Sequence, residues 1–407
     1  MSEKIFTGRV FGGMLLVAGS CIGAGMLALP ILTGMVGFYP SLLLFFIAWA
    51  FMTFTGLLMV EVNGWFQGQV NVVSMAKKTL GFSGKTLAWT LYLFLFYALL
   101  VAYISASGGL FSVFFQESFG RQMPEWLASL LFTLFFGIVI YLGTKPVDIW
   151  NRYLMAGLIL SYFGMIFLGL GKVDATYFSH TNWKYLLMPL PVLVVSFGFH
   201  NMIPSLFTYL HGSIRKTRLT ILGGSLITLA IYLIWELLVL GVVPLSGSGG
   251  IQDSYERGVE AAQAMRAVLG SNWITAYAQG FAFFAIVTSF LAQGLSLTHF
   301  LADGFKLHPE KKHSLPLCLL TLAPPFIFAM VYPQIFFQAL SFAGGICAVI
   351  LFGIMPALMV WIGRYKKQLS FGYRIPGGKF SLILVILFSL FIVLAEFLKI
   401  LKIPFFF

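Results

Sequence analysis

Eleven apolar segments, each about as long as a membrane-spanning helix, constrain the fold of this chain more than any other feature. A helix needs about 20 predominantly apolar residues to cross a bilayer. Only 9% of the 407 residues are charged and 59% are hydrophobic, whereas soluble domains carry about 25% charged residues. The sequence therefore predicts an all-α polytopic membrane protein with eleven transmembrane helices. We expect them over residues 10–33, 37–60, 86–113, 127–143, 150–171, 186–208, 219–243, 272–301, 315–332, 336–361 and 380–401.

The basic residues indicate how these spans are oriented. Cytoplasmic loops of membrane proteins carry an excess of Lys and Arg. If the N-terminal segment 1–9 is cytoplasmic, 18 of the 25 Lys and Arg residues fall on the cytoplasmic side and 7 on the other. An odd number of spans then puts the C-terminus outside the cytoplasm. These loops account for the net charge of +12, so we expect the lipid bilayer as a partner and no nucleic acid.

Two of the apolar segments are interrupted by residues that weaken a helix. The first contains "AGSCIGAGMLALP" (18–30), and the sixth contains "SFGFHNMIP" (196–204). Irregular backbone at membrane depth is tolerated only where it lines a cavity or is buried in protein. Interrupted helices at matching places in two halves of a chain point to the binding site of a transporter.

The two interruptions belong to an internal repeat. They lie about 177 residues apart, and the same offset carries the second span onto the seventh and the third onto the eighth, with looser matches for the fourth and fifth. We therefore expect one repeat over 10–171, another over 186–361 and an extra helix over 380–401. Because five spans is an odd number, the prediction is a five-plus-five inverted repeat with discontinuous helices 1 and 6.

Several stretches carry a resemblance to a known family. "GSCIGAGMLALP" (19–30), "SFGFHNMIPS" (196–205), "GTKPVDIWNR" (143–152) and "GYRIPGG" (372–378) resemble the hydroxy and aromatic amino acid permeases of the amino acid/polyamine/organocation superfamily, above all the bacterial tyrosine-specific ones. The likeness runs from about residue 5 to 400. It implies a leucine-transporter-type fold in the bacterial inner membrane and proton-driven import of aromatic amino acids. We expect tyrosine as the substrate, although the choice between tyrosine, tryptophan and phenylalanine stays open.

With this resemblance, the two interruptions become the expected substrate site. Backbone amides around Ala24 and Gly25 should take the substrate carboxylate, and carbonyl oxygens near Gly19 and Phe197 its ammonium group. Aromatic side chains could stack on the substrate, and Asn201 could bond a phenol or an indole N–H. The expected substrate-binding residues are Gly19, Ser20, Cys21, Gly23, Ala24, Gly25, Tyr97, Tyr103, Phe197, Gly198, Phe199, His200 and Asn201.

Two coupling ions remain possible. Histidine titrates near neutral pH, and ionisable groups inside a membrane are often functional. His200, Glu236 and Glu61 are therefore the candidates for proton coupling. Sodium-coupled members of the superfamily instead pair hydroxyls of the eighth span with carbonyls of the first interruption. The corresponding cation site would consist of Gly19, Ile22, Ala285, Thr288 and Ser289.

The sequence gives no sign of an enzyme or a channel. It has no HExxH motif and no pattern of a paired nucleophile and base, and a channel would need repeated polar stripes along its spans. Cys21, Cys318 and Cys347 match no metal or disulfide spacing. We therefore expect no catalytic residue, no cofactor and no metal, and the oligomeric state stays open.

Overall fold

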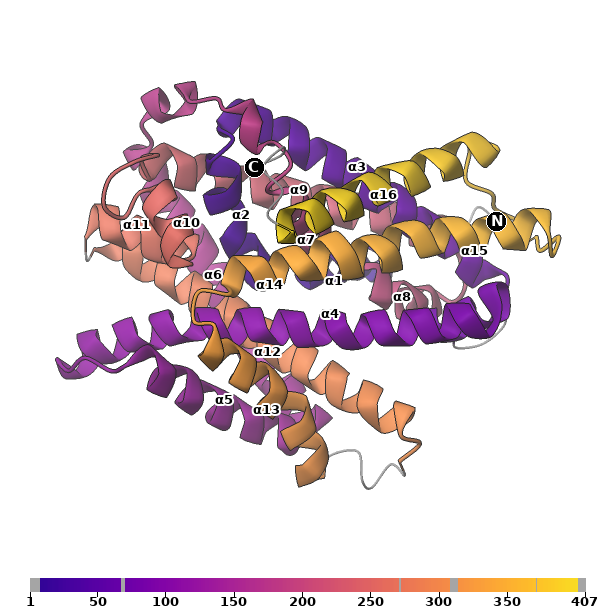
Figure 1. The fold of residues 1–407 in the computed structure, drawn as a ribbon, viewed down its shortest axis with the longest axis horizontal. Helices are drawn as coiled ribbons and strands as arrows, with labels where there is room; N and C mark the ends of the chain where they lie inside the picture. Colours follow the sequence, from indigo (N-terminus) through magenta and orange to yellow (C-terminus); the bar gives the residue numbers. More distant parts are fainter. Residues whose placement is uncertain (1–7, 67–69, 271, 308–313, 371, 402–407) are drawn as a thin grey trace.

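The computed structural model describes residues 8–66, 70–270, 272–307, 314–370 and 372–401, and the regular structure in these ranges is helical throughout (Figure 1). Residues 1–7 of the predicted cytoplasmic N-terminus lie outside the described residues. The longer helices are α1 (Gly8–Cys21), α2 (Ala24–Gly34), α3 (Phe38–Gly64), α4 (Val72–Phe119), α5 (Glu125–Tyr141), α6 (Thr144–Gly169), α9 (Ile214–Val242), α12 (Trp273–Gly304), α13 (Leu315–Val331), α15 (Met355–Tyr365) and α16 (Gly378–Ile400). The shorter ones are α7 (Leu190–Ser196), α8 (Ile203–Tyr209), α10 (Ile251–Arg257), α11 (Ala261–Leu269), α14 (Phe336–Phe342), the 3₁₀ turns η1 (Leu170–Lys172), η2 (Ala175–Ser179), η3 (Trp183–Tyr185) and η4 (His200–Met202), and the π-helix η6 (Ala343–Ile354).

The described helices confirm a polytopic membrane protein. Eight helical segments are long and apolar enough to cross a membrane, and the bent pair α1–α2 makes up to nine. The apolar helices α5 and α13 have 17 residues each, the lower end of the range for a span. The count of eleven spans remains a prediction.

Helix α4 is much longer than the predicted span 86–113. It begins at Val72, after a capping box in which Asn71 and Ser74 satisfy each other's backbone amides. Gly81 bends it with φ +80°, a backbone conformation that residues with a side chain rarely adopt. The polar first part, with Lys77 and Lys78, is therefore joined to the apolar span without an intervening loop.

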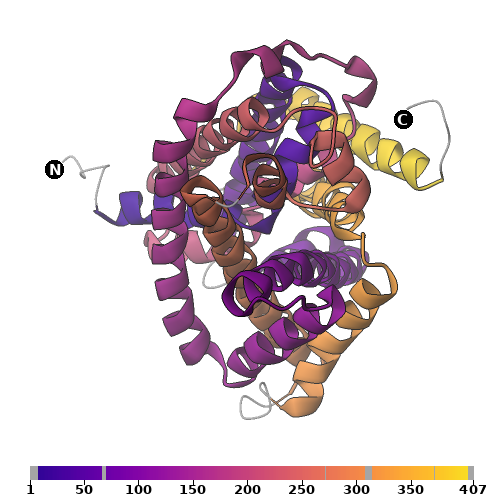
Figure 2. The ribbon, with the colours of Figure 1, turned by 90° about the vertical axis from the view of Figure 1, so that its left-hand side faces the viewer.

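Small residues let the helices of the bundle approach closely, as in many membrane proteins. A Cβ atom at Gly224 of α9 would lie 2.6 Å from Val17 of α1, and one at Gly157 of α6 would lie 2.5 Å from Phe284 of α12. These close approaches explain two of the main packed pairs, α1 with α9 and α6 with α12. Figure 1 shows α5 and α13 on one side of α4, and Figure 2 shows α16 at the edge of the bundle.

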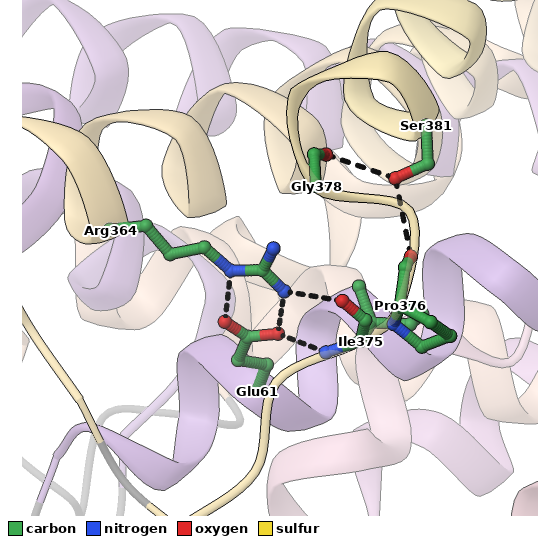
Figure 3. A network of polar contacts seen from close by, with 6 residues as sticks. All are labelled: Glu61, Arg364, Ile375, Pro376, Gly378 and Ser381. Atoms are coloured by element: carbon green, nitrogen blue, oxygen red, sulfur yellow. Dashed lines mark hydrogen bonds and ion pairs between the residues drawn. The ribbon is translucent and has the colours of Figure 1, made fainter.

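A buried ion pair fixes the end of α3 that lies near the connection between α15 and α16 (Figure 3). Arg364 of α15 donates through two nitrogens to the carboxylate of Glu61, with Nε to Oε1 at 2.6 Å. The Ile375 amide donates to Glu61 over 2.9 Å, and the Ile375 carbonyl accepts from Arg364 over 3.1 Å. The side chains of Glu61 and Arg364 are 0% and 4% exposed, so three segments meet at a desolvated charge pair.

A compact pair of helices, α10 and α11, follows α9 and packs on α2, α9 and α12. Gly258 separates them with φ +70°. The buried Glu260 caps α11 by accepting hydrogen bonds from the amides of Ala262 at 2.6 Å and Gln263 at 3.0 Å. Burial raises the pKa of Glu260 from its ordinary 4.5 to about 7, and the two amides only partly oppose this.

The raised pKa of Glu260 predicts that stability falls as the pH rises from about 4.5 to about 7. In that range the unfolded chain has released the proton and the folded protein still holds it. The free energy of unfolding therefore falls by about 3 kcal/mol across the range. Thermal unfolding of the detergent-solubilised protein between pH 4.5 and 7 should therefore show a larger loss for wild type than for Glu260→Gln, whose amide oxygen can accept one of the two capping bonds but whose side chain cannot titrate. An equal loss in both proteins would contradict this.

Candidate functional site

The first span is interrupted between α1 and α2, as the glycines predict. The two helices are bent by 60°, and Gly23 is extended, with φ −164° and ψ −161°. Three hydrogen bonds of a continuous helix would join the carbonyls of residues 19, 20 and 21 to the amides of residues 23, 24 and 25, and the structure shows none of them. The break therefore exposes backbone donors and acceptors in the middle of the span.

Two side chains form hydrogen bonds with some of the backbone amides and carbonyls that this break exposes. The amide of Ala24 donates to Ser289 Oγ over 3.3 Å, and the Tyr232 hydroxyl lies 2.7 Å from the carbonyl oxygen of Cys21. The amides of Gly23 and Gly25 and the carbonyl of Gly19 have no bonding partner among the described residues. Two donors and at least one acceptor thus remain available for a ligand.

The sixth span is interrupted as well. Helix α7 ends at Ser196, and Phe197 and Phe199 take non-helical conformations before the turn η4 and helix α8. At Gly198 a Cβ atom would lie 2.7 Å from the carbonyl oxygen of Val195, so a residue with a side chain would force this backbone to move. The prediction of a discontinuous sixth helix is confirmed.

The two interruptions face each other. A Cβ atom at Gly25 would lie 2.8 Å from Ser196 Oγ. The Tyr232 hydroxyl of α9 lies 2.8 Å from the Ser196 carbonyl as well as 2.7 Å from that of Cys21, and its single hydrogen can serve one of them at a time. Tyr232, which the sequence did not single out, therefore joins both broken spans.

A cavity of about 240 Å³ lies at this meeting point. Its volume is below the roughly 300–1,000 Å³ of sites for drug-sized ligands, so it suits one small molecule. Of the residues expected at the substrate site, those that line it are Gly19, Ser20, Cys21, Gly23, Ala24, Gly25, Tyr103, Gly198 and Asn201. The rest of its wall includes Phe96, Asn151, Met155, Gln293, Ser296 and Phe352, which sequence reasoning missed.

Four expected substrate-site residues lie outside this cavity. The hydroxyl of Tyr97 donates to the Leu320 carbonyl over 2.8 Å, toward α13. The ring of Phe197 packs on Tyr232, with centroids 5.1 Å apart, and Phe199 packs against Gly56 of α3. His200 is buried between the rings of Phe199 and Phe352.

The three candidates for proton coupling occupy different surroundings. His200 Nε2 lies 2.9 Å from the Thr55 hydroxyl, and its Nδ1 has no partner among the described residues. Glu61 is bonded to Arg364, as described above. Glu236 of α9 is fully buried and contacts the Thr33 hydroxyl of α2. None of the three lines the cavity.

The candidate cation site is partly assembled. Gly19, Ile22, Thr288 and Ser289 line the cavity, and Ala285 does not. The Thr288 hydroxyl lies within hydrogen-bond distance of carbonyls of its own helix, at 2.8 and 3.2 Å, and Ser289 accepts from Ala24. In the described part of the chain, no group of three or more His, Cys, Asp or Glu residues could hold a metal ion. Cys21, Cys318 and Cys347 are free thiols.

A larger hollow of about 890 Å³ adjoins the cavity and shares Phe96, Asn201 and Ser296 with it. It is lined further by Lys85 and Lys306, which lie between predicted spans 2 and 3 and between spans 8 and 9, two of the connections predicted to be cytoplasmic. The cavity therefore continues toward the end of the bundle where these basic residues lie.

Comparison with known proteins agrees with this arrangement. The family model of the tryptophan/tyrosine permease family matches residues 7–396. "Tyrosine-specific transport system 2" of Haemophilus influenzae is 35% identical over 96% of both chains, and "Tyrosine-specific transport system 1" of that organism is 34% identical over 94% of this chain and 95% of its own. The "Tryptophan-specific transport protein" of Haemophilus influenzae is 30% identical over 95% of both chains.

A family match over nearly the whole chain, with a cavity between two broken spans, settles the class of protein. The chain belongs to the tryptophan/tyrosine permease family, and it is a membrane transport protein and not an enzyme.

Proposed function

We propose that the protein is a secondary active symporter that imports tyrosine, or another aromatic amino acid, together with protons by alternating access. It would lie in a bacterial inner membrane with its N-terminus in the cytoplasm and its C-terminus outside. The names of the relatives support the aromatic class, since two are tyrosine transport systems and one carries tryptophan.

This proposal rests on the backbone amides and the carbonyl at the first break that have no hydrogen-bond partner among the described residues. Each break in a helix leaves orphan amides and carbonyls that need partners. Ser289 and Tyr232 take one amide and one carbonyl, which leaves the amides of Gly23 and Gly25 for a carboxylate and the carbonyl of Gly19 for an ammonium group. The amides stand at the N-terminus of α2, where the helix dipole favours an anion. An amino acid carries both groups on one carbon atom and so fits this pattern.

The remaining wall of the cavity suits an aromatic side chain with a polar tip. Phe96 and Phe352 offer aromatic faces, and Asn201 and Gln293 offer amides that can donate to or accept from a phenol or an indole. Tyrosine and tryptophan both satisfy this description. We place tyrosine first because the two tyrosine transport systems are somewhat more similar to this chain than the tryptophan protein is.

We also propose eleven spans in a five-plus-five inverted repeat, with α16 as the extra helix. The packing of the helices supports it. In the proposed repeat, α6 corresponds to the segment α14–α15 and α12 corresponds to α4; α6 packs on α12, and α14–α15 packs on α4. In the same way α1 corresponds to the broken helix α7–α8 and α9 corresponds to α3; α1 packs on α9, and α7 and α8 pack on α3. Each contact in one pair therefore has its counterpart in the other. The two repeats could then rock about the central cavity, which continues toward the end of the bundle that holds Lys85 and Lys306; the proposed orientation makes this the cytoplasmic end.

Sodium is the alternative coupling ion, because Ser289 and the free carbonyl of Gly19 both line the cavity. One contact weakens the sodium site, because Ser289 already accepts a hydrogen bond from Ala24. The Thr288 hydroxyl donates to its own helix and keeps its lone pairs, so Thr288 does not separate the two ions.

Uptake of labelled tyrosine into proteoliposomes tests this function. With an alkaline lumen and no sodium, we expect tyrosine to accumulate above its external concentration, and tryptophan and phenylalanine to compete in proportion to their affinity. A protonophore should abolish the accumulation. If tyrosine accumulates only after sodium is added outside, the proton proposal is wrong. If none of the three amino acids enters, the aromatic proposal is wrong.

A further inference from the structure

One buried carboxyl group inside the bundle has no positive partner. Glu236 of α9 is 0% exposed, and no ion pair reaches it from any described residue. Its Oε2 atom has no hydrogen-bond partner among the described residues, and its Oε1 atom contacts the Thr33 hydroxyl of α2. An unpaired charge in the middle of a span costs about 2.5–3.5 kcal/mol on insertion scales, so this group calls for an explanation.

Counting hydrogens shows which form of Glu236 fits these contacts. Thr33 Oγ1 lies 2.6 Å from the carbonyl oxygen of Leu29 and is also bonded to Glu236. A hydroxyl carries one hydrogen, and a carboxylate and a carbonyl can only accept. If Glu236 were ionised, two acceptors would share that hydrogen. If Glu236 carries a proton, it donates to Thr33 and Thr33 donates to Leu29, so both contacts are hydrogen bonds.

Helix α9 connects this group to the substrate cavity. Tyr232, four residues before Glu236 and on the same face of the helix, touches the carbonyls of Cys21 and Ser196 at the two breaks. Trp235 donates to the carbonyl of Met26 over 3.0 Å. Trp235 and Glu236 of α9 thus hold α2 at Met26 and at Thr33 near its far end, and Tyr232 holds the break that precedes α2.

We infer that Glu236 is the proton-binding group of the transporter, and that its protonation is coupled through the Thr33 contact to the position of the half-helix α2. This inference rests on the proposed function. In the state seen here the proton is bound. Loss of the proton would leave a buried charge between α9 and α2, so it requires the two helices to separate or water to enter.

Other titratable groups lie near this part of α9. Those on the elements packed against it, or directly beside those elements, are Tyr39, Tyr162, Lys172, Asp174, Tyr177, His180, Glu260 and Arg266. Tyr162 donates to the Ile231 carbonyl, His180 lies 3.3 Å from the Met35 carbonyl, and Glu260 caps α11. Of the other coupling candidates, Glu61 is bonded to Arg364, and His200 lies in the sixth span, stacked between Phe199 and Phe352 and bonded to Thr55 of α3.

Replacing Glu236 by Gln tests the inference, because the Gln amide can donate to Thr33 as the protonated acid does. We expect Glu236→Gln to exchange internal for external tyrosine as wild type does, and to lose accumulation driven by an alkaline lumen, so that internal tyrosine only reaches its external concentration. Glu396→Gln is the matched control. Glu396 is a buried glutamate of α16 that accepts from Ser341, and this variant should still accumulate tyrosine.

The outcomes separate this inference from the proposed function. If wild type itself shows no proton-driven accumulation, the proposed function fails. If wild type and Glu236→Gln both accumulate tyrosine, or if a folded Glu236→Gln loses exchange as well, only the role of Glu236 is overturned. If Glu236→Gln does not fold, Glu236→Asp decides. Its shorter side chain withdraws from Thr33, so the external pH for half-maximal accumulation should shift, and an unchanged pH profile would overturn the inference.

Discussion

Replacing Glu61 by Gln is expected to destabilise the protein by about 3–5 kcal/mol, because it leaves the charge of Arg364 buried without a carboxylate. The pair is almost completely removed from solvent, so water cannot replace the lost partner. The Ile375 amide would also lose its charged acceptor. The measurement is the thermal unfolding midpoint and the yield of monodisperse protein in detergent.

Two matched variants show whether burial of the charge is the cause. Asp148→Asn breaks the exposed pair of Asp148 with Arg152, whose side chains are 56% and 76% exposed, and should change stability by less than about 1 kcal/mol. Glu61→Met combined with Arg364→Met removes both charges, and should recover much of what Glu61→Gln loses. If Glu61→Gln is as stable as Asp148→Asn, our description of this pair is wrong.

Replacing Gly23 by Ala is expected to lower the rate of tyrosine uptake by about tenfold or more, with little loss of folded protein. The new Cβ atom would lie 2.4 Å from Ser289 Oγ, a separation that requires the break to move. Gly23 is extended rather than left-handed, so the cost is the contact and not its backbone conformation. Uptake into proteoliposomes, normalised to reconstituted protein, is the measurement.

The crowding at Gly23 can be relieved. The Cβ atom of Ser289 would lie 3.7 Å from the new methyl group, an ordinary contact, so Gly23→Ala with Ser289→Ala should transport as well as Ser289→Ala alone. Gly171→Ala is the control, since a Cβ atom there meets nothing within 4 Å. Normal uptake by Gly23→Ala would show that the geometry of this break does not limit transport.

The helices and the two breaks could be predicted from the sequence because the physical signals are local. Apolar runs of about 20 residues predict spans, and the glycines clustered at 19–25, with Gly198 and Pro204 in the sixth span, predict where helices unwind. The structure has helices over all the predicted segments and breaks at both places. The π-helix η6 gave no such signal, since i→i+5 bonding has no residue pattern that distinguishes it from an apolar α-helix.

The side chains of the site were harder to predict, because their positions depend on contacts between distant segments. In the sixth span, Gly198 and Asn201 line the cavity, whereas Phe197 and Phe199 turn away from it to pack on Tyr232 and Gly56. A chain with 44 phenylalanines offers no local means to tell these cases apart. Tyr232, Asn151 and Gln293 lie in spans without a break, so nothing in their own segments marked them.

The movement of protons with tyrosine tests the central claim most directly. Proteoliposomes that contain a pH-sensitive dye, with equal pH on both sides and no sodium, would receive tyrosine outside. Our account predicts that the lumen becomes more acidic when tyrosine is added and stays unchanged when lysine is added. Entry of labelled tyrosine without any change in the lumenal pH would contradict proton symport.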